Sequence, residues 1–141
     1  MNIDVKNCEI IKLKHIVDKN DGDLSIAEQN KEIPFEIKRV YYIYELLNNK
    51  SSRGFHAHKK LDQVIFCLNG HFKLLVDDGT NKKRILLSNP NQGVFIGNEL
   101  WHTMSNFSKN CIILVFASDY YDESDYIRDY NEFIRYIKGI K

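Results

Sequence analysis

The stretch Arg53-Gly-Phe-His-Ala-His-Lys-Lys-Leu-Asp-Gln63 decides the fold, with Cys67-Leu-Asn-Gly70 a short way downstream. Successive side chains of a β-strand point to opposite faces, so His56 and His58, two residues apart, project from the same face. Farther along the chain, His102 is the third histidine of the pattern. These residues predict a barrel whose mouth is lined by histidines.

Short segments with strand character fill the first two-thirds of the chain. They are rich in β-branched and aromatic residues, and turn signals such as Asn69-Gly70 and Asp78-Gly79 separate them. The predicted strands are 37–44, 63–68, 71–76, 84–87, 93–96 and 111–117, and a segment at 100–107 carries His102. Many short strands at close spacing favour a sandwich or barrel over parallel βαβ units. We therefore predict an all-β fold, a cupin (RmlC-like jelly-roll) barrel of antiparallel strands over about residues 8–118.

The tail has a different pattern. From Asp125 onward, apolar residues recur at helical spacing, with Asp122 or Ser124 as the expected cap and Gly139 where a helix would end. The residues of this pattern are Tyr126, Ile127, Tyr130, Phe133, Ile134 and Ile137. They predict a C-terminal α-helix over about residues 123–138, packed on the barrel, with aromatics that serve packing rather than a cofactor. Residues 1–141 are expected to form one domain.

Composition limits the possible functions. Of the 141 residues, 43% are hydrophobic and 12% aromatic, which excludes a disordered chain. The net charge of +1 argues against nucleic-acid binding, and no apolar run approaches the length of a membrane span. The first residues do not resemble a signal peptide. Three cysteines, an odd number at unpatterned spacing, indicate a reduced, cytoplasmic protein.

The histidines can hold a metal or move protons. A metal-binding cupin needs four converging donors, but the expected carboxylate position, five residues after His58, holds Gln63, a poor ligand for a divalent cation. The adjacent Asp62 is expected to point to the other face of the strand. We therefore predict no metal, and expect His56 and His58 to act as general acid and base, with ordinary pKa values near ~6.5. Each histidine can alternatively be a hydrogen-bonded residue of the barrel wall.

A second strand contributes polar groups to the same mouth. Arg39 and Tyr41 alternate onto one face and Tyr42 onto the other. An arginine aimed into a barrel is costly unless it meets an anion, and phosphate matches a guanidinium in a bidentate way. Arg53, next to the histidine strand, is a second phosphate candidate, with surface ion pairs as the alternative use of either arginine. Tyr41 is suited to donate a proton to a developing oxyanion.

Four segments carry a specific likeness to a known family. They are 34–43 (Pro-Phe-Glu-Ile-Lys-Arg-Val-Tyr-Tyr-Ile), 53–64, 67–70 and 117–128 (Ala-Ser-Asp-Tyr-Tyr-Asp-Glu-Ser-Asp-Tyr-Ile-Arg). Over about residues 10–136 the chain resembles the TDP-4-keto-6-deoxyglucose 3,4-ketoisomerases, small cupins of the WxcM-like group.

The resemblance implies an enzyme without a metal or other cofactor, acting on a TDP-linked keto sugar in 3-amino-3,6-dideoxyhexose synthesis. It implies His56 as the principal base, His58 as its active-site neighbour, and Tyr41 as a further residue of the site. It also implies a homodimer, often formed by exchange of N-terminal strands. His102 matches the branch that makes the galacto-configured product at C4, whereas Asp21 stands where that branch tends to have arginine.

The residues suit this chemistry. A C4 ketone acidifies the C3 proton, so His56 can remove it and Tyr41 can stabilise the resulting enediolate. We expect Arg39, Arg53, His102 and Gln63 to bind the substrate. No glycine-rich dinucleotide fingerprint occurs in the sequence, in keeping with a reaction that has no redox step.

Three alternatives remain open at this point. A TDP-4-keto-sugar 3,5-epimerase would bind the same substrate, but its chemistry usually uses a histidine backed by an aspartate. A non-catalytic sugar-nucleotide-binding cupin would retain Arg39 and the aromatics but would not need His56 and His58 side by side. A metal-dependent cupin would carry stoichiometric metal near His56.

Overall fold

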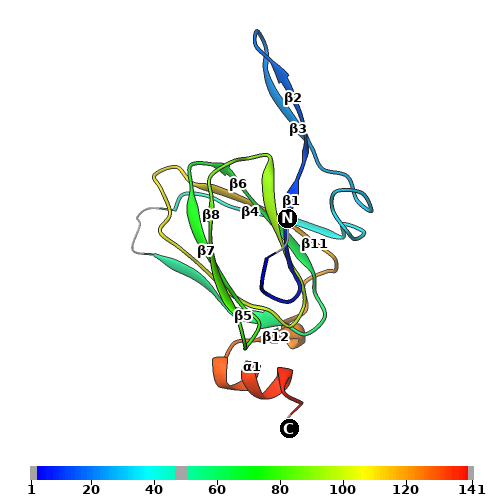
Figure 1. The fold of residues 1–141 in the computed structure, drawn as a ribbon, viewed down its shortest axis with the longest axis vertical. Coiled ribbons are helices and arrows are strands. Elements are labelled where there is room, and N and C mark those ends of the chain that lie inside the picture. The colour runs from blue at the N-terminus through cyan, green and yellow to red at the C-terminus, as the bar shows by residue number, and fades with distance from the viewer. Residues whose placement is uncertain (1–2, 47–50, 140–141) are drawn as a thin grey trace.

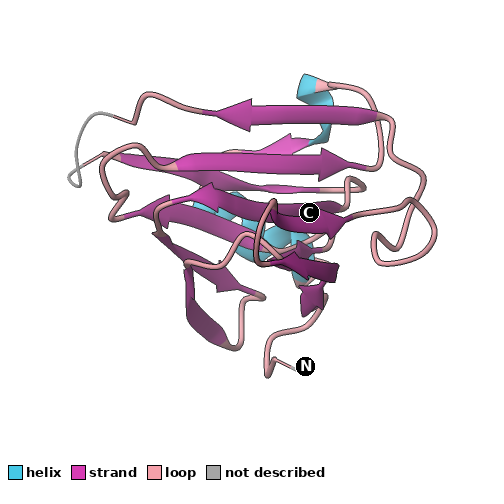
Figure 2. Cartoon of the chain, turned by 90° about the horizontal axis from the view of Figure 1, so that it is seen from above, coloured by secondary structure: helices cyan, strands magenta, loops and turns pink. Residues whose placement is uncertain are grey.

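Two five-stranded antiparallel sheets form the body of the protein, as a computed structural model describes it for residues 3–46 and 51–139 (Figure 1). The first sheet has the order β1 (Cys8–Lys12), β9 (Gln92–Ile96), β6 (Gln63–Asn69), β11 (Ile112–Ala117) and β4 (Arg39–Ile43). The second has the order β12 (Tyr126–Ile127), β5 (Ser52–His58), β10 (Trp101–Ser105), β7 (Phe72–Asp77) and β8 (Lys82–Leu87). The predicted antiparallel jelly-roll barrel is confirmed. Figure 2 shows the strands running side by side, with loops gathered at both of their ends.

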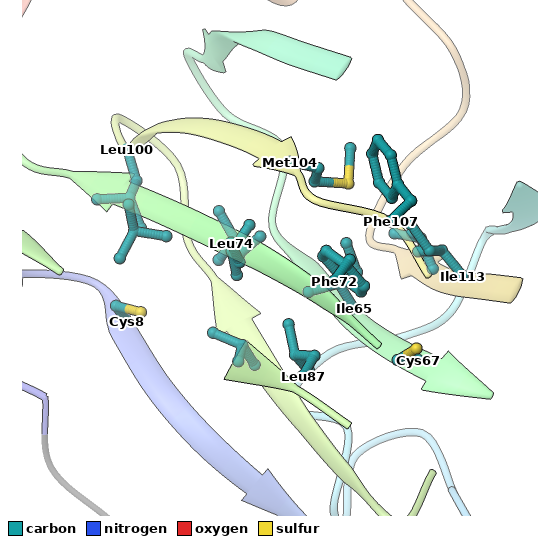
Figure 3. Packing of buried hydrophobic residues seen from close by; sticks show 14 of the residues in the cluster. Cys8, Ile65, Cys67, Phe72, Leu74, Leu87, Leu100, Met104, Phe107 and Ile113 are labelled. Carbon is teal, nitrogen blue, oxygen red and sulfur yellow. The ribbon is translucent and has the colours of Figure 1, made fainter. Parts of the chain in front are cut away.

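The core lies between the two sheets. Alternating residues of facing strands, such as Ile65 and Cys67 of β6 and Phe72 and Leu74 of β7, are buried in one cluster (Figure 3). Strand geometry with a period of two turns these side chains toward the space between the sheets, whereas Val64 and Phe66 of β6 point the other way and are buried in a second cluster with Ile33 and Phe35. The same alternation carries polar residues inward at one end of the barrel, where the candidate site lies.

The six strands predicted from turn signals are all present, with ends that differ by at most two residues. A hairpin of β2 (Lys14–Asp18) and β3 (Gly22–Ile26) was not predicted. It forms a separate two-stranded sheet that projects from the barrel (Figure 1), and its side chains are almost all exposed. In β2 the apolar residues Ile16 and Val17 are adjacent, so this strand lacks the alternation of apolar and polar residues by which strands are usually recognised.

The predicted C-terminal helix exists, but its predicted start at residues 123–125 is wrong. A 3₁₀ turn spans Glu123–Asp125, β12 follows, and α1 covers Tyr130–Ile137 with Asp129 as its N-cap. Tyr126 and Ile127 are strand residues because their backbones pair with β5. Asp122 caps the 3₁₀ turn instead of the helix, since its side chain accepts a hydrogen bond from the Ser124 amide.

Helix α1 packs on one end of the outer face of the second sheet. Phe133 is fully buried, and its ring lies 5.7 Å from that of Trp101 on β10. Tyr130 donates a hydrogen bond of 2.7 Å to the buried carboxylate of Asp77 on β7. Gly139 follows the helix with φ of +69°, as expected for a residue that ends one. No helix in the described part of the chain is both long and apolar enough to cross a membrane.

Candidate active site

The structure brings the three predicted histidines together inside the mouth of the barrel. His56 and His58 lie on β5 with ring centroids 5.0 Å apart, and His102 lies on the neighbouring strand β10. His102 pairs directly with His56 in the sheet, and their ring centroids are 4.6 Å apart. His58 and His102 are nearly fully buried, so the cluster is largely shielded from water.

A β-bulge next to the histidines sets this register. His102 pairs with His56, whereas the next residue, Thr103, pairs with Gly54, so Phe55 is the extra residue of β5. Gly54 and Phe55 both have positive φ angles, +89° and +58°. A Cβ atom at Gly54 would lie 2.8 Å from the carbonyl oxygen of His102, so the strands can approach this closely only with glycine there.

Hydrogen bonds orient the imidazole rings. Nδ1 of His56 lies 3.1 Å from the carbonyl oxygen of Gly54, and Nδ1 of His58 lies 3.1 Å from Oδ2 of Asp125. Carbonyl and carboxylate oxygens only accept hydrogen bonds, so Nδ1 is the assigned donor in both rings. Each neutral ring then has an unprotonated Nε2, which is the atom a general base uses.

The electrostatics keep the histidines neutral. Burial lowers the pKa of His56, and the nearby positive charge of Arg128 lowers it further. Burial and the neighbouring His56 lower the pKa of His58, although the carboxylate of Asp125 partly offsets this. Burial also lowers the pKa of His102, well below its ordinary value. All three are therefore bases at neutral pH.

Tyr41 of β4 and Gln63 of β6 form a hydrogen-bonded pair in the first sheet. The side-chain amide of Gln63 donates a 2.7 Å hydrogen bond to the hydroxyl oxygen of Tyr41. Burial raises the pKa of Tyr41 to about 12, so the phenol stays protonated. Because Gln63 supplies a donor, the hydroxyl hydrogen of Tyr41 is free to point to another acceptor. Gln63, which the sequence predicts as a substrate ligand, is 3% exposed and lies against Tyr41.

The predicted arginines occupy different environments. Arg39 is partly buried, its guanidinium lies over the Tyr41 ring at 5.5 Å, and its Nε has no hydrogen-bond partner among the described residues. Tyr42 faces the other way and is 63% exposed, as the alternation predicts. Arg53 is exposed on β5, and its charge is one of those that act on the Tyr41 phenol to lower its pKa.

Two residues that contact the histidines were missed by the sequence reasoning. The Tyr126 ring, expected to serve packing, lies 4.4 Å from that of His58 and 5.0 Å from that of His56. Asp125 contacts His58 although 67 residues separate them in the sequence. Both contacts form because the two-residue strand β12 pairs with β5, and a strand of two residues is too short to show a sequence period. The motif at 117–128 was the one feature of the sequence that could have indicated them.

A pocket opens beside this cluster and extends it toward solvent. Arg39, His58, Lys60, Ser118 and Tyr126 are among the residues that line it. Lys60, which the sequence analysis did not single out, adds a second cation to the lining of this pocket. Within residues 3–46 and 51–139, no group of three or more His, Cys, Asp or Glu side chains is arranged to hold a metal ion.

The fold and the site together define a cupin with a histidine-lined mouth suited to proton transfer. The family model FdtA, described as WxcM-like, C-terminal, matches residues 6–138. The chain belongs to this family, whose sugar-nucleotide 3,4-ketoisomerases it resembles in sequence and structure.

Two relatives show how close the likeness is. TDP-4-oxo-6-deoxy-alpha-D-glucose-3,4-oxoisomerase from Aneurinibacillus thermoaerophilus is 49% identical over 132 residues, 94% of either chain. The 3,4-ketoisomerase QdtA from Thermoanaerobacterium thermosaccharolyticum is 44% identical, with a TM-score of 0.91 over 96% of both chains. That structure is a histidine-to-asparagine mutant in complex with TDP-4-keto-6-deoxyglucose.

A more distant structure supports the fold alone. The RmlC epimerase of Mycobacterium tuberculosis shares 15% identity, with a TM-score of 0.75 over 89% of this chain and 70% of that chain. The jelly-roll cupin architecture is therefore common to both.

Proposed function

We propose that this protein is a sugar-nucleotide 3,4-ketoisomerase that converts TDP-4-keto-6-deoxy-D-glucose into a TDP-3-keto-6-deoxyhexose. The observation that carries the proposal is the cluster of three neutral histidines, together with the protonated hydroxyl of Tyr41 on β4. The 49% identical oxoisomerase, matched over 94% of both chains, supports the substrate and the reaction.

The geometry suits a proton transfer through an enediolate. The C4 ketone acidifies the C3 proton, and Nε2 of His56 removes it as general base. Negative charge then develops on the sugar oxygens, where the Tyr41 hydroxyl donates a hydrogen bond. Return of a proton to C4, with the hydroxyl proton moved from O3 to O4, gives the 3-ketone. The step is redox-neutral for the sugar as a whole and is proposed to need neither a metal nor a nicotinamide.

We further propose the galacto configuration at C4 of the product. This assignment rests on His102, which matches the histidine of that branch and faces His56 across the β5–β10 pair. The product would supply an aminotransferase in 3-amino-3,6-dideoxyhexose synthesis for a cell-surface glycan.

The nucleotide is proposed to be held by the arginines. The Nε of Arg39 is buried without a partner in the described chain, which leaves a strong donor for a phosphate oxygen. Arg53 is exposed and near enough to the site to influence Tyr41. Replacing Arg39 with lysine, which keeps the charge but not the fork of donors, should raise the Kd for TDP more than the matched Arg53→Lys change.

A homodimer is also proposed, in which the projecting β2–β3 hairpin packs on a second copy. The hairpin exposes Val17 and Leu24, at 61% and 56%, and this apolar area favours a partner surface. Leu24→Asp should shift sedimentation toward the monomer, whereas Leu86→Asp, on a residue 59% exposed on β8, should not. Equal sedimentation of the two variants would contradict this interface.

A cytoplasmic location completes the proposal. It rests on the odd number of cysteines, at unpatterned spacing, and on a sugar-nucleotide substrate.

The direct test of His56 is the His56→Asn variant. We expect it to lose turnover of TDP-4-keto-6-deoxyglucose while binding TDP with an unchanged Kd. His71→Asn is the matched control, because His71 lies in the loop between β6 and β7. Near-normal turnover by His56→Asn would remove this residue from the mechanism.

One observation favours a second candidate, a TDP-4-keto-sugar 3,5-epimerase. His58 is paired with Asp125 at 3.1 Å, and a histidine backed by an aspartate suits that chemistry. An epimerase would exchange the protons at C3 and C5 and retain the 4-ketone.

A further inference from the structure

The Asp125 carboxylate joins the C-terminal segment to the end of the histidine strand. It accepts hydrogen bonds from the backbone amides of Lys60, at 2.8 Å to Oδ1, and Leu61, at 3.3 Å to Oδ2. The backbone carbonyl of Asp125 accepts a further hydrogen bond, from the Lys59 amide at 2.9 Å. With its side chain 14% exposed, Asp125 is held by several contacts on the barrel side of the 3₁₀ turn. Its position is therefore fixed by the backbone and does not depend on His58.

The third hydrogen bond of this carboxylate determines how His58 is protonated. Oδ2 lies 3.1 Å from Nδ1 of His58, and an ionised carboxylate can only accept a hydrogen bond. The neutral imidazole must therefore carry its hydrogen on Nδ1 and leave a lone pair on Nε2. That Nε2 atom is buried and has no hydrogen-bond partner among the described residues. A buried polar atom without a partner costs free energy unless a ligand satisfies it.

We infer that Asp125 is a positioning residue, which holds His58 as the Nδ1–H tautomer so that Nε2 accepts a hydrogen bond from a hydroxyl of the bound keto sugar. The inference rests on the proposed function for the identity of the sugar. The tautomer is a property of the free protein and does not rest on it.

The Asp125→Asn variant tests this inference because it can replace the carboxylate oxygen that accepts a hydrogen bond from His58 with an NH₂ group that donates one. The amide oxygen of the new side chain is expected to keep the hydrogen bond from the Lys60 N–H, because that is the shorter of the two backbone contacts. The NH₂ group then takes the place of Oδ2, which faces His58 and the Leu61 amide. The opposite orientation would set two donors against each other at 2.8 Å. With an NH₂ group facing Nδ1, His58 has to accept there, so its hydrogen moves to Nε2. The variant therefore removes the acceptor and nearly preserves the shape.

The experiment measures the tautomer first. Two-bond proton–nitrogen correlation spectra of the ¹⁵N-labelled full-length protein at pH 8 distinguish a protonated from an unprotonated ring nitrogen. His58 signals are assigned by their loss in His58→Asn. We expect Nδ1–H in the wild type and Nε2–H in Asp125→Asn. Asp129→Asn is the matched control, because asparagine caps helix α1 as well as aspartate does and Asp129 lies outside the site.

The kinetic measurement then asks whether the tautomer matters to the reaction. We expect Asp125→Asn to lower kcat at least about tenfold, as for loss of a proton-transfer contact, with a change in KM below about threefold. Asp129→Asn should retain both values. An Nε2–H tautomer in the wild type would overturn the inference even if Asp125→Asn does not fold, and so would a kcat that Asp125→Asn leaves unchanged. Absence of ketoisomerase activity in the wild type would instead refute the proposed function and leave the tautomer result standing.

Discussion

Replacing Gly54 with alanine should destabilise the protein and disturb its site at the same time. Gly54 has φ of +89° in the bulge of β5, a conformation that L-residues rarely adopt. An added Cβ would lie 2.8 Å from the His102 carbonyl oxygen and 3.2 Å from Thr103 Cα. Both are backbone atoms of the neighbouring strand, so no side chain can turn away to relieve the contact.

The size of the effect follows from two contributions. A positive φ costs alanine about 1–2 kcal/mol, and forcing extra volume into a packed site costs about 1–3 kcal/mol more. Gly22→Ala isolates the first contribution, because Gly22 has φ of +92° and nothing within 4 Å of its Cβ position. We therefore expect Gly54→Ala to lose about 3 kcal/mol of unfolding free energy and Gly22→Ala about half as much.

Urea titration of both variants and the wild type, at one protein concentration, measures these differences by linear extrapolation. Turnover of TDP-4-keto-6-deoxyglucose should also fall in Gly54→Ala, since the clash displaces the backbone carbonyl of His102 and with it the His102 ring. If Gly54→Ala costs no more than Gly22→Ala, the close approach of β5 and β10 at the bulge is not real. The account of how the histidines are aligned would then be refuted.

Other predictions concern titration and hydrogen bonds. Burial holds the pKa of each clustered histidine below 6.5, so below that pH the unfolded chain binds more protons than the folded one. As the pH is lowered from 6.5 toward the folded pKa values, the unfolding free energy should decrease by up to about 1.4 kcal/mol per pH unit for each histidine. His102→Asn should reduce this decrease, as measured by urea titrations at pH 7.5 and pH 5.5. Tyr41→Phe should lower kcat about 100-fold with little change in KM, because it removes the donor to the developing oxyanion; unchanged kcat would exclude that role. Tyr130→Phe removes one of the donors to the buried Asp77 carboxylate, which also accepts a hydrogen bond from the Gly79 amide and pairs with Lys82. It should lower the unfolding free energy by about 1–3 kcal/mol, measured in urea, with kcat retained; a stability equal to wild type would mean that this contact does not anchor α1.

The placement of His56 and His58 was predictable because it depends only on strand alternation, whereas the position of His102 opposite His56 depends on the β5–β10 pairing and its bulge. His56 and His58 share a face in any strand, and a late strand beside them carries His102. The six strands bounded by turn signals such as Asn69-Gly70 were predictable for the same reason, since local chemistry determines both their period and their ends.

The residues that the sequence reasoning misplaced depend on tertiary contacts instead. Tyr126 and Ile127 have helical spacing with the residues after them, yet they extend the sheet because β5 offers an unpaired edge. The pairing of Asp125 with His58 follows from that strand and has no local signature. The β2–β3 hairpin was missed because the adjacent apolar residues of β2 break the alternation of apolar and polar residues.

The most direct test of the central claim is proton NMR of TDP-4-keto-6-deoxyglucose incubated with the protein in heavy water. The account predicts conversion to a 3-keto sugar with deuterium at C4, and reduction of the product should give the C4 coupling of the galacto configuration. Exchange at C3 and C5 with the 4-ketone retained would contradict the account in favour of an epimerase. Tight binding of TDP without any exchange would mean that the histidine cluster binds a sugar nucleotide and does not transform it.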